Sequence, residues 1–116
     1  MDGKDNDQNF LTRQHSVVAL ADLSECQECQ EDIITSGIIP HLVDLVVDGP
    51  YYSAGMRRDC ARILANIAER KPEQIIIDVG RGRIESWFDT VDKLADARLK
   101  PSAERACNLL RDAITI

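Results

Sequence analysis

The sequence predicts an all-α fold in which one set of helices occurs twice. Apolar residues in the long segments recur every three or four positions, which is the spacing of one face of an α-helix. Glycine and proline stand between these segments, where they favour helix ends and turns. The order of a short, a medium and a long segment then repeats, and equivalent positions lie about 45 residues apart.

The first third of the chain is expected to hold a polar tail and two helices. Residues 1–9 are polar and show no periodicity, so we expect them to be disordered. Residues 10–24 carry apolar side chains over a wide face and predict a helix. A polar break comes next, and residues 31–36 then predict a short helix that Gly37 closes.

The middle of the chain predicts a medium and a long helix. Pro40 suits the first turn of a helix that continues over 41–47, although this apolar run alone would also fit a buried strand. After a Gly-Pro loop, residues 56–69 form the clearest helical pattern in the sequence. Its apolar positions have the spacing i, i+4, i+7, i+8 and i+11, and they are Met56, Cys60, Ile63, Leu64 and Ile67.

The last third of the chain repeats this order. Residues 72–80 form a short apolar segment between a proline and a glycine. Gly82 opens a medium segment around Trp87 and Phe88, which we expect in the core. Residues 103–114 predict the closing long helix, after a break at a proline–serine pair.

Length and charge exclude several functional classes. The chain has 116 residues and a formal net charge of −6 at pH 7, so binding to nucleic acid, which needs basic patches, is not expected. No apolar run is long enough to span a membrane, and the acidic start lacks the basic and apolar regions of a secretory signal. We therefore expect an intracellular protein without a membrane partner, located in the cytoplasm, with the nucleus as the alternative.

Four cysteines raise the question of metal or redox chemistry. Cys26 and Cys29 form a C-x-x-C pair, which is half of a zinc site or a redox motif. A zinc site usually needs a second close pair, whereas Cys60 and Cys107 stand alone in helical apolar patterns. A redox motif would come after a β-strand, and no strand is predicted before this pair. We expect no metal and no cofactor, and we keep a metal or redox role of Cys26 and Cys29 as a minor alternative.

Two motifs resemble the armadillo repeat family. Residues 64–68 read Leu-Ala-Asn-Ile-Ala, which is similar to the end of the long helix in that family. Residues 37–46 read Gly-Ile-Ile-Pro-His-Leu-Val-Asp-Leu-Val, which is similar to the start of its medium helix. The second unit departs from this pattern, because Glu85 replaces the proline and two aromatic residues replace aliphatic ones.

The resemblance implies an armadillo- or HEAT-like solenoid, a right-handed αα-superhelix of about two and a half repeats. Residues 10–116 would form this domain, with a closing helix at 10–24 and repeats at 25–69 and 71–115. Such repeats share a core by stacking on their neighbours, and a short array leaves its ends open. Self-association through the ends of the solenoid is therefore a further expectation.

The resemblance also implies a binding groove. In armadillo proteins the long helices line a concave groove that holds extended peptides, and an asparagine there bonds the peptide backbone. The candidate partner-binding residues that the resemblance places in this groove are Asp22, Arg58, Arg62, Asn66, Asn108 and Asp112. Only Asn66 keeps the amide at the asparagine position, and Arg58 and Arg62 share its helix face. This basic and polar stripe suits an acidic partner, and the alternative is a solvated face whose charges pair within the chain.

These observations together favour a non-enzymatic scaffold or adaptor that binds a protein or peptide. The sequence contains no motif of known catalytic chemistry, and its two histidines have no nucleophile at a recognisable spacing. We therefore do not expect an enzyme. The alternative is that the chain is a regulatory or docking segment of a larger protein that also contains an enzyme.

Overall fold

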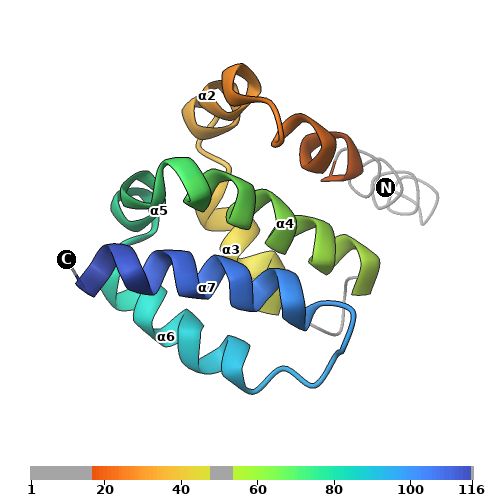
Figure 1. The fold of residues 1–116 in the computed structure, drawn as a ribbon, viewed down its shortest axis with the longest axis vertical. Coiled ribbons are helices and arrows are strands. Elements are labelled where there is room, and N and C mark those ends of the chain that lie inside the picture. Colours follow the sequence, from red (N-terminus) through yellow and green to blue (C-terminus); the bar gives the residue numbers. More distant parts are fainter. Residues whose placement is uncertain (1–16, 48–53, 116) are drawn as a thin grey trace, which may run out of the picture.

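A computed structural model describes residues 17–47 and 54–115 (Figure 1). The described residues form helices with short connections and no β-strand, which confirms the predicted all-α class. The tail at 1–9, the first part of the helix expected at 10–24 and the Gly-Pro loop lie outside the described residues. Among the described helices, none combines the length and the apolar character that crossing a bilayer requires.

The described helices occur in the predicted order. Residues 17–23 are helical, and we call them the first helical segment. The next helices along the chain are α2 (Gln27–Thr35), α3 (Ile39–Val47), α4 (Ala54–Arg70), α5 (Pro72–Val79), α6 (Arg81–Asp92) and α7 (Lys100–Thr115). Two shorter helices precede a long one in each half, with 9, 9 and 17 residues and then 8, 12 and 16 residues.

The start of α2 differs from the prediction. The helix begins at Gln27, whereas the apolar pattern placed its start at Glu31. The first turn of α2 is polar and therefore adds nothing to an apolar periodicity, although glutamine and glutamate are good helix formers. Cys26 is the N-cap and has an extended backbone, with φ −93° and ψ 124°. The break between the two helices is thus confined to residues 24–26.

The start of α7 also differs from the prediction. The helix begins at Lys100, so Pro101 lies in its first turn and does not interrupt the chain. Proline is tolerated there because the first turn of a helix does not use its N–H groups. The turn before α7 is held by Asp96, whose Oδ1 accepts hydrogen bonds from the backbone N–H groups of Arg98 at 2.8 Å and Leu99 at 3.4 Å.

Glycines end the two short helices α2 and α5, as predicted. Gly37 has φ 77° and Gly80 has φ 97°, and both values lie in the left-handed region that other residues rarely adopt. Gly80 also begins α6, so one residue joins the two helices without a loop.

Helix α4 lies at the centre of the core. Its side chains Ile63, Leu64 and Ile67 are fully buried, and it packs most extensively against α7 and also against α3 and α5. Trp87 and Phe88 on α6 are 4% and 7% exposed, which confirms their expected place in the core. Burial of one large apolar side chain contributes about 1.5–3 kcal/mol, so α4 holds the two halves together.

The first helical segment, α4 and α7 run in the same direction and lie beside one another on one side of the molecule (Figure 1). Helix α3 lies behind α4 and also contacts α5 and α6. The long helices of both halves therefore share one surface with the first helical segment. We call this surface the three-helix face.

Candidate functional site

The six residues predicted to bind a partner all lie on the three elements of the three-helix face. Asp22 belongs to the first helical segment, and the remaining residues lie on α4 (Arg58, Arg62 and Asn66) and on α7 (Asn108 and Asp112). The residues of each long helix are four positions apart, so they line one side of that helix. The structure shows which of them contact one another and which do not.

Arg62 and Asp22 join α4 to the first helical segment. Arg62 Nη2 donates a hydrogen bond to Asp22 Oδ1 at 3.0 Å, and Arg62 Nη1 lies 3.8 Å from Asp59 Oδ1 on the same helix. Arg62 Nε is buried and has no hydrogen-bond partner among the described residues. The Asp22 side chain is 74% exposed, so this ion pair stabilises the fold by at most about 1 kcal/mol.

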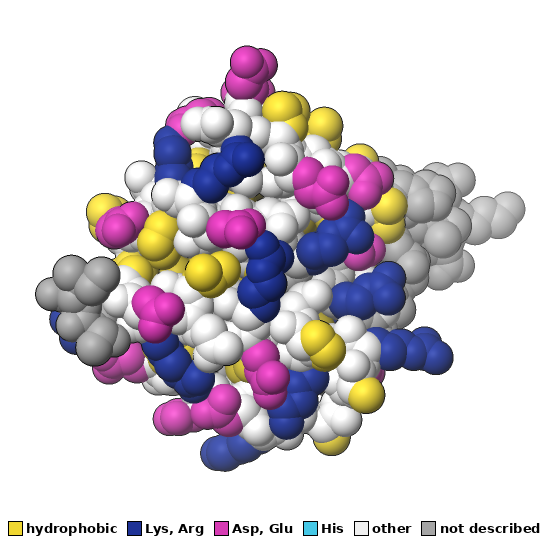
Figure 2. Space-filling model, in the orientation of Figure 1, with side chains coloured by type: hydrophobic (Ala, Val, Ile, Leu, Met, Phe, Trp, Pro, Cys, Tyr) yellow, Lys and Arg dark blue, Asp and Glu magenta, His cyan; other side chains and the backbone are white. Residues whose placement is uncertain are grey.

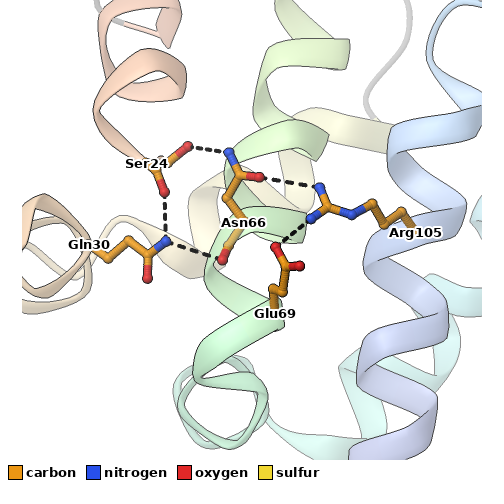
Figure 3. Close-up of polar contacts among 5 residues, drawn as sticks. All are labelled: Ser24, Gln30, Asn66, Glu69 and Arg105. Atoms are coloured by element: carbon orange, nitrogen blue, oxygen red, sulfur yellow. Dashed lines mark hydrogen bonds and ion pairs between the residues drawn. The ribbon is translucent and has the colours of Figure 1, made fainter. Parts of the chain in front are cut away.

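Asn66 is the centre of a polar network that spans three elements (Figure 3). Its Nδ2 donates to Ser24 Oγ at 2.9 Å, and its Oδ1 accepts a bond from Arg105 Nη1 at 3.2 Å. The other end of the Arg105 guanidinium donates to Glu69 Oε2 at 2.6 Å. We call the five residues drawn in Figure 3 the Asn66 network: Ser24, Gln30, Asn66, Glu69 and Arg105.

Gln30 is the buried member of the Asn66 network. Gln30 is only 3% exposed, and its Nε2 donates to Ser24 O at 2.6 Å and to Asn66 O at 3.2 Å. Ser24 is fully buried, and its hydroxyl donates to Ala21 O at 2.7 Å while it accepts from Asn66. Gln30 and Ser24 therefore fix the first helical segment and α2 to the C-terminal half of α4.

The Asn66 amide is engaged within the chain but is not saturated. A side-chain amide carries two N–H donors and two acceptor lone pairs, and the contacts to Ser24 and Arg105 use one of each. A hollow of about 250 Å³ adjoins the amide and is lined by Ser24, Glu25, Gln30, Asn66, Glu69 and Arg70. The described hydrogen bonds thus leave one N–H donor and one acceptor lone pair of the Asn66 amide unused.

The other candidate residues lie further out on the face. Arg58 is exposed, and no ion pair joins it to another described residue. Asn108 and Asp112 are exposed on α7 and make no contact with α4 through their side chains among the described hydrogen bonds. The structure therefore brings Arg62 to Asp22, and leaves Arg58, Asn108 and Asp112 as separate exposed groups.

Sequence reasoning missed Arg105, Gln30 and Ser24. Arg105 contacts α4 across 39 positions in the sequence, and only the packing of α7 on α4 determines that register. Its neighbour Glu104 instead lies 3.8 Å from Lys100 on the same helix. Ser24 and Gln30 fall in the predicted polar break, where one signal was available: Gln30 lies three positions before Ile33, so the two share one side of a helix.

The cysteines divide into two classes. Cys60 and Cys107 are fully buried, and burial raises the pKa of each thiol to about 12. Cys26 is exposed and Cys29 is partly exposed. Within the part of the chain that the structure describes, no three His, Cys, Asp or Glu side chains gather as a metal ion would require.

A second hollow lies on another side of the molecule, between α3 and α6. It measures about 350 Å³ and is lined by Val43, Asp44, Val47, Gly82, Arg83, Ser86, Trp87 and Thr90. Arg83 Nη2 donates to Asp44 Oδ1 at 2.9 Å and so joins the two helices at this hollow. The indole N–H of Trp87 is buried and has no hydrogen-bond partner among the described residues.

Comparison with known proteins gives no family assignment for this chain. No family model matches it, and neither a curated protein nor a solved structure matches it. A function for this chain is therefore inferred from its own contacts, burial and charges.

Proposed function

We propose that the chain is a non-enzymatic scaffold of the armadillo type that binds a protein or peptide on the three-helix face. The observation that carries this proposal is the parallel, side-by-side arrangement of the first helical segment, α4 and α7. Such an arrangement presents three rows of side chains at a regular spacing, which suits an extended chain that crosses the helices.

The order of the helices supports the armadillo-like superhelix. Two shorter helices and a long one occur twice, and the long helices α4 and α7 form the most extensive contact between elements. Contact between equivalent helices of successive units is how repeats share one core. In this account the described residues contain two repeats, α2 to α4 and α5 to α7, after the end of an earlier one.

The charge of the two long helices favours an acidic partner. Helix α4 carries four arginines and two acidic residues, and α7 carries three basic and two acidic residues, within a chain whose net charge is −6. On the side that Figure 2 shows, side chains of both signs are interspersed and form no patch of a single sign. A partner would therefore be recognised by carboxylates at particular positions more than by total charge.

Two arginines can receive such carboxylates. Arg58 is exposed and has no ion pair with a described residue, so a partner carboxylate can bind it without displacing a carboxylate of the described part of the chain. Arg62 is bound to the exposed Asp22, and exposed ion pairs are weak, so a partner carboxylate can replace Asp22 at small cost. The free donor of Asn66 then lies one turn further along α4 for a backbone carbonyl of the same peptide.

The proposal is tested by fluorescence anisotropy with the full chain, a library of glutamate-rich peptides and the same library with lysine in place of glutamate. Binding is expected for members of the glutamate-rich set alone. Arg58→Glu is expected to weaken the best interaction by about tenfold, which corresponds to loss of one charge-assisted contact. Arg98→Glu, which reverses an exposed arginine in the connection between α6 and α7, is the matched control and should bind as the wild type does. Equal losses in both variants, or equal binding of both libraries, would refute the proposal.

A further inference from the structure

Cys26 and Cys29 occupy the two ends of the first turn of α2. Cys26 is the N-cap, and its carbonyl accepts the first helical hydrogen bond from Gln30 N–H at 3.0 Å. Cys29 lies three residues later, inside the helix. Side chains three positions apart on a helix have their Cβ atoms about 5–6 Å apart. The local fold thus holds both thiols at the same helix end.

The backbone allows the two sulfur atoms to meet. A disulfide needs Cβ atoms about 3.5–4.5 Å apart, which is closer than the spacing within a regular helix. Cys26 has an extended backbone, with φ −93° and ψ 124°, so its side chain does not have the direction that a helical backbone would impose. Side-chain rotation moves Sγ but not Cβ, so the Cβ gap closes through the backbone of Cys26, which precedes the regular helix. The two thiols already share a hydrogen bond, so their sulfur atoms start close together.

The electrostatics distinguish the two thiols. The backbone N–H and the thiol of Cys29, and after them the backbone N–H of Glu28, lower the pKa of Cys26 below its ordinary value. The pKa of Cys29 is raised by its hydrogen bond with Cys26, by burial and by the acidic side chains of Asp32 and Glu28. A thiolate and not a thiol is the nucleophile, so Cys26 is the more reactive of the pair.

Accessibility separates this pair from the other cysteines. Cys26 is exposed and Cys29 is partly exposed, whereas Cys60 and Cys107 are fully buried in the core. A small disulfide in solution can therefore reach Cys26 but not the core thiols while the chain is folded.

We propose that Cys26 and Cys29 are a site of reversible disulfide formation by exchange with a low-molecular-weight disulfide such as oxidised glutathione. The Cys26 thiolate attacks one sulfur of glutathione disulfide, which forms a mixed disulfide on Cys26 and releases one glutathione thiolate. Cys29 then loses its proton and attacks the Cys26 sulfur, which forms the Cys26–Cys29 disulfide and releases the second glutathione. The chain is oxidised by two electrons, one glutathione disulfide is reduced to two glutathione molecules, and the reverse reaction restores the dithiol. This site does not depend on the partner proposed for the three-helix face.

The test is incubation of the reduced, folded full chain with mixtures of reduced and oxidised glutathione, and then acid quench, alkylation and peptide mass spectrometry. The expected product is a Cys26–Cys29 disulfide whose fraction rises and falls with the glutathione ratio, while Cys60 and Cys107 stay reduced. Cys29→Ser should stop the reaction at a mixed disulfide with glutathione on Cys26.

The matched variant Cys26→Ser identifies the attacking thiol. Its Cys29 is expected to react with glutathione disulfide about tenfold more slowly than Cys26 does in Cys29→Ser. In Cys29→Ser, Cys26 keeps the hydrogen bonds from the backbone N–H groups of residues 29 and 28 that lower its pKa, and it is the more exposed of the two thiols. Circular dichroism of both variants checks that α2 remains folded, and in denaturant the two rates should become equal. Absence of the Cys26–Cys29 disulfide at every glutathione ratio, or equal rates in the two folded variants, would overturn the proposal.

Discussion

Gln30→Leu tests how firmly the Asn66 network joins the first helical segment to α4. The Gln30 amide is almost fully buried and donates to the backbone carbonyls of Ser24 at 2.6 Å and Asn66 at 3.2 Å. Leucine has a similar size, so the substitution removes two hydrogen bonds and adds little strain. A typical hydrogen bond contributes about 0.5–1.5 kcal/mol net, and two such bonds correspond to a loss of about 1–3 kcal/mol in the free energy of unfolding.

The assay is urea unfolding monitored by circular dichroism, with Gln27→Leu as the control. Gln27 lies on the same helix but is exposed, so the same substitution there should change the free energy of unfolding by less than about 0.5 kcal/mol. The dependence on urea should be equal for all three proteins, since the surface exposed on unfolding is the same. If Gln30→Leu and Gln27→Leu have the same stability, the network does not hold these elements together and the reasoning is wrong.

Burial and charge predict three further outcomes. Arg105→Ala should lower the free energy of unfolding by less than about 1 kcal/mol, because the contacts of Arg105 are exposed. Urea unfolding at two salt concentrations tests this, and the effect should be smaller at high salt. A loss above about 2 kcal/mol would contradict the prediction. Leu64→Ala should cost about 2–5 kcal/mol because the side chain is fully buried, whereas Ile77→Ala, at a side chain 73% exposed, should cost less than about 0.5 kcal/mol in the same assay. Burial raises the pKa of Cys60 and Cys107 to about 12 from an ordinary value of 9.0, so the folded chain holds these protons longer than the unfolded chain. The contribution of these two thiols to the free energy of unfolding should be complete below pH 9 and should decline as the pH rises toward 12. A Cys60→Ala, Cys107→Ala double variant should lose that part of the pH dependence when unfolding is measured at several pH values.

The long helices could be predicted from the sequence because their apolar spacing is a local property. Helix α4 was expected at 56–69 and extends from Ala54 to Arg70, and its expected core residues are buried. The starts of helices whose first turn lacks apolar residues were harder to predict from the sequence. The polar first turn of α2 and the proline in the first turn of α7 carry no apolar signal, so both helices begin earlier than the pattern suggested.

The candidate site shows the same limit. A spacing of four residues is enough to place Arg58, Arg62 and Asn66 on one side of α4, and the structure places all three on that helix. The partners of Arg62 and Asn66 could not be read in this way. Asp22 and Arg105 reach α4 from positions 40 and 39 residues away, and only the packing between helices sets which side chains meet there.

The most direct test of the proposed scaffold is amide-correlation NMR of the full chain during titration with the tightest glutamate-rich peptide from the binding assay. Changes in chemical shift are expected to concentrate on α4 around Arg58, Arg62 and Asn66 and to continue onto the neighbouring surface of α7. Changes confined to the hollow between α3 and α6, or no changes at saturating peptide, would contradict the proposal.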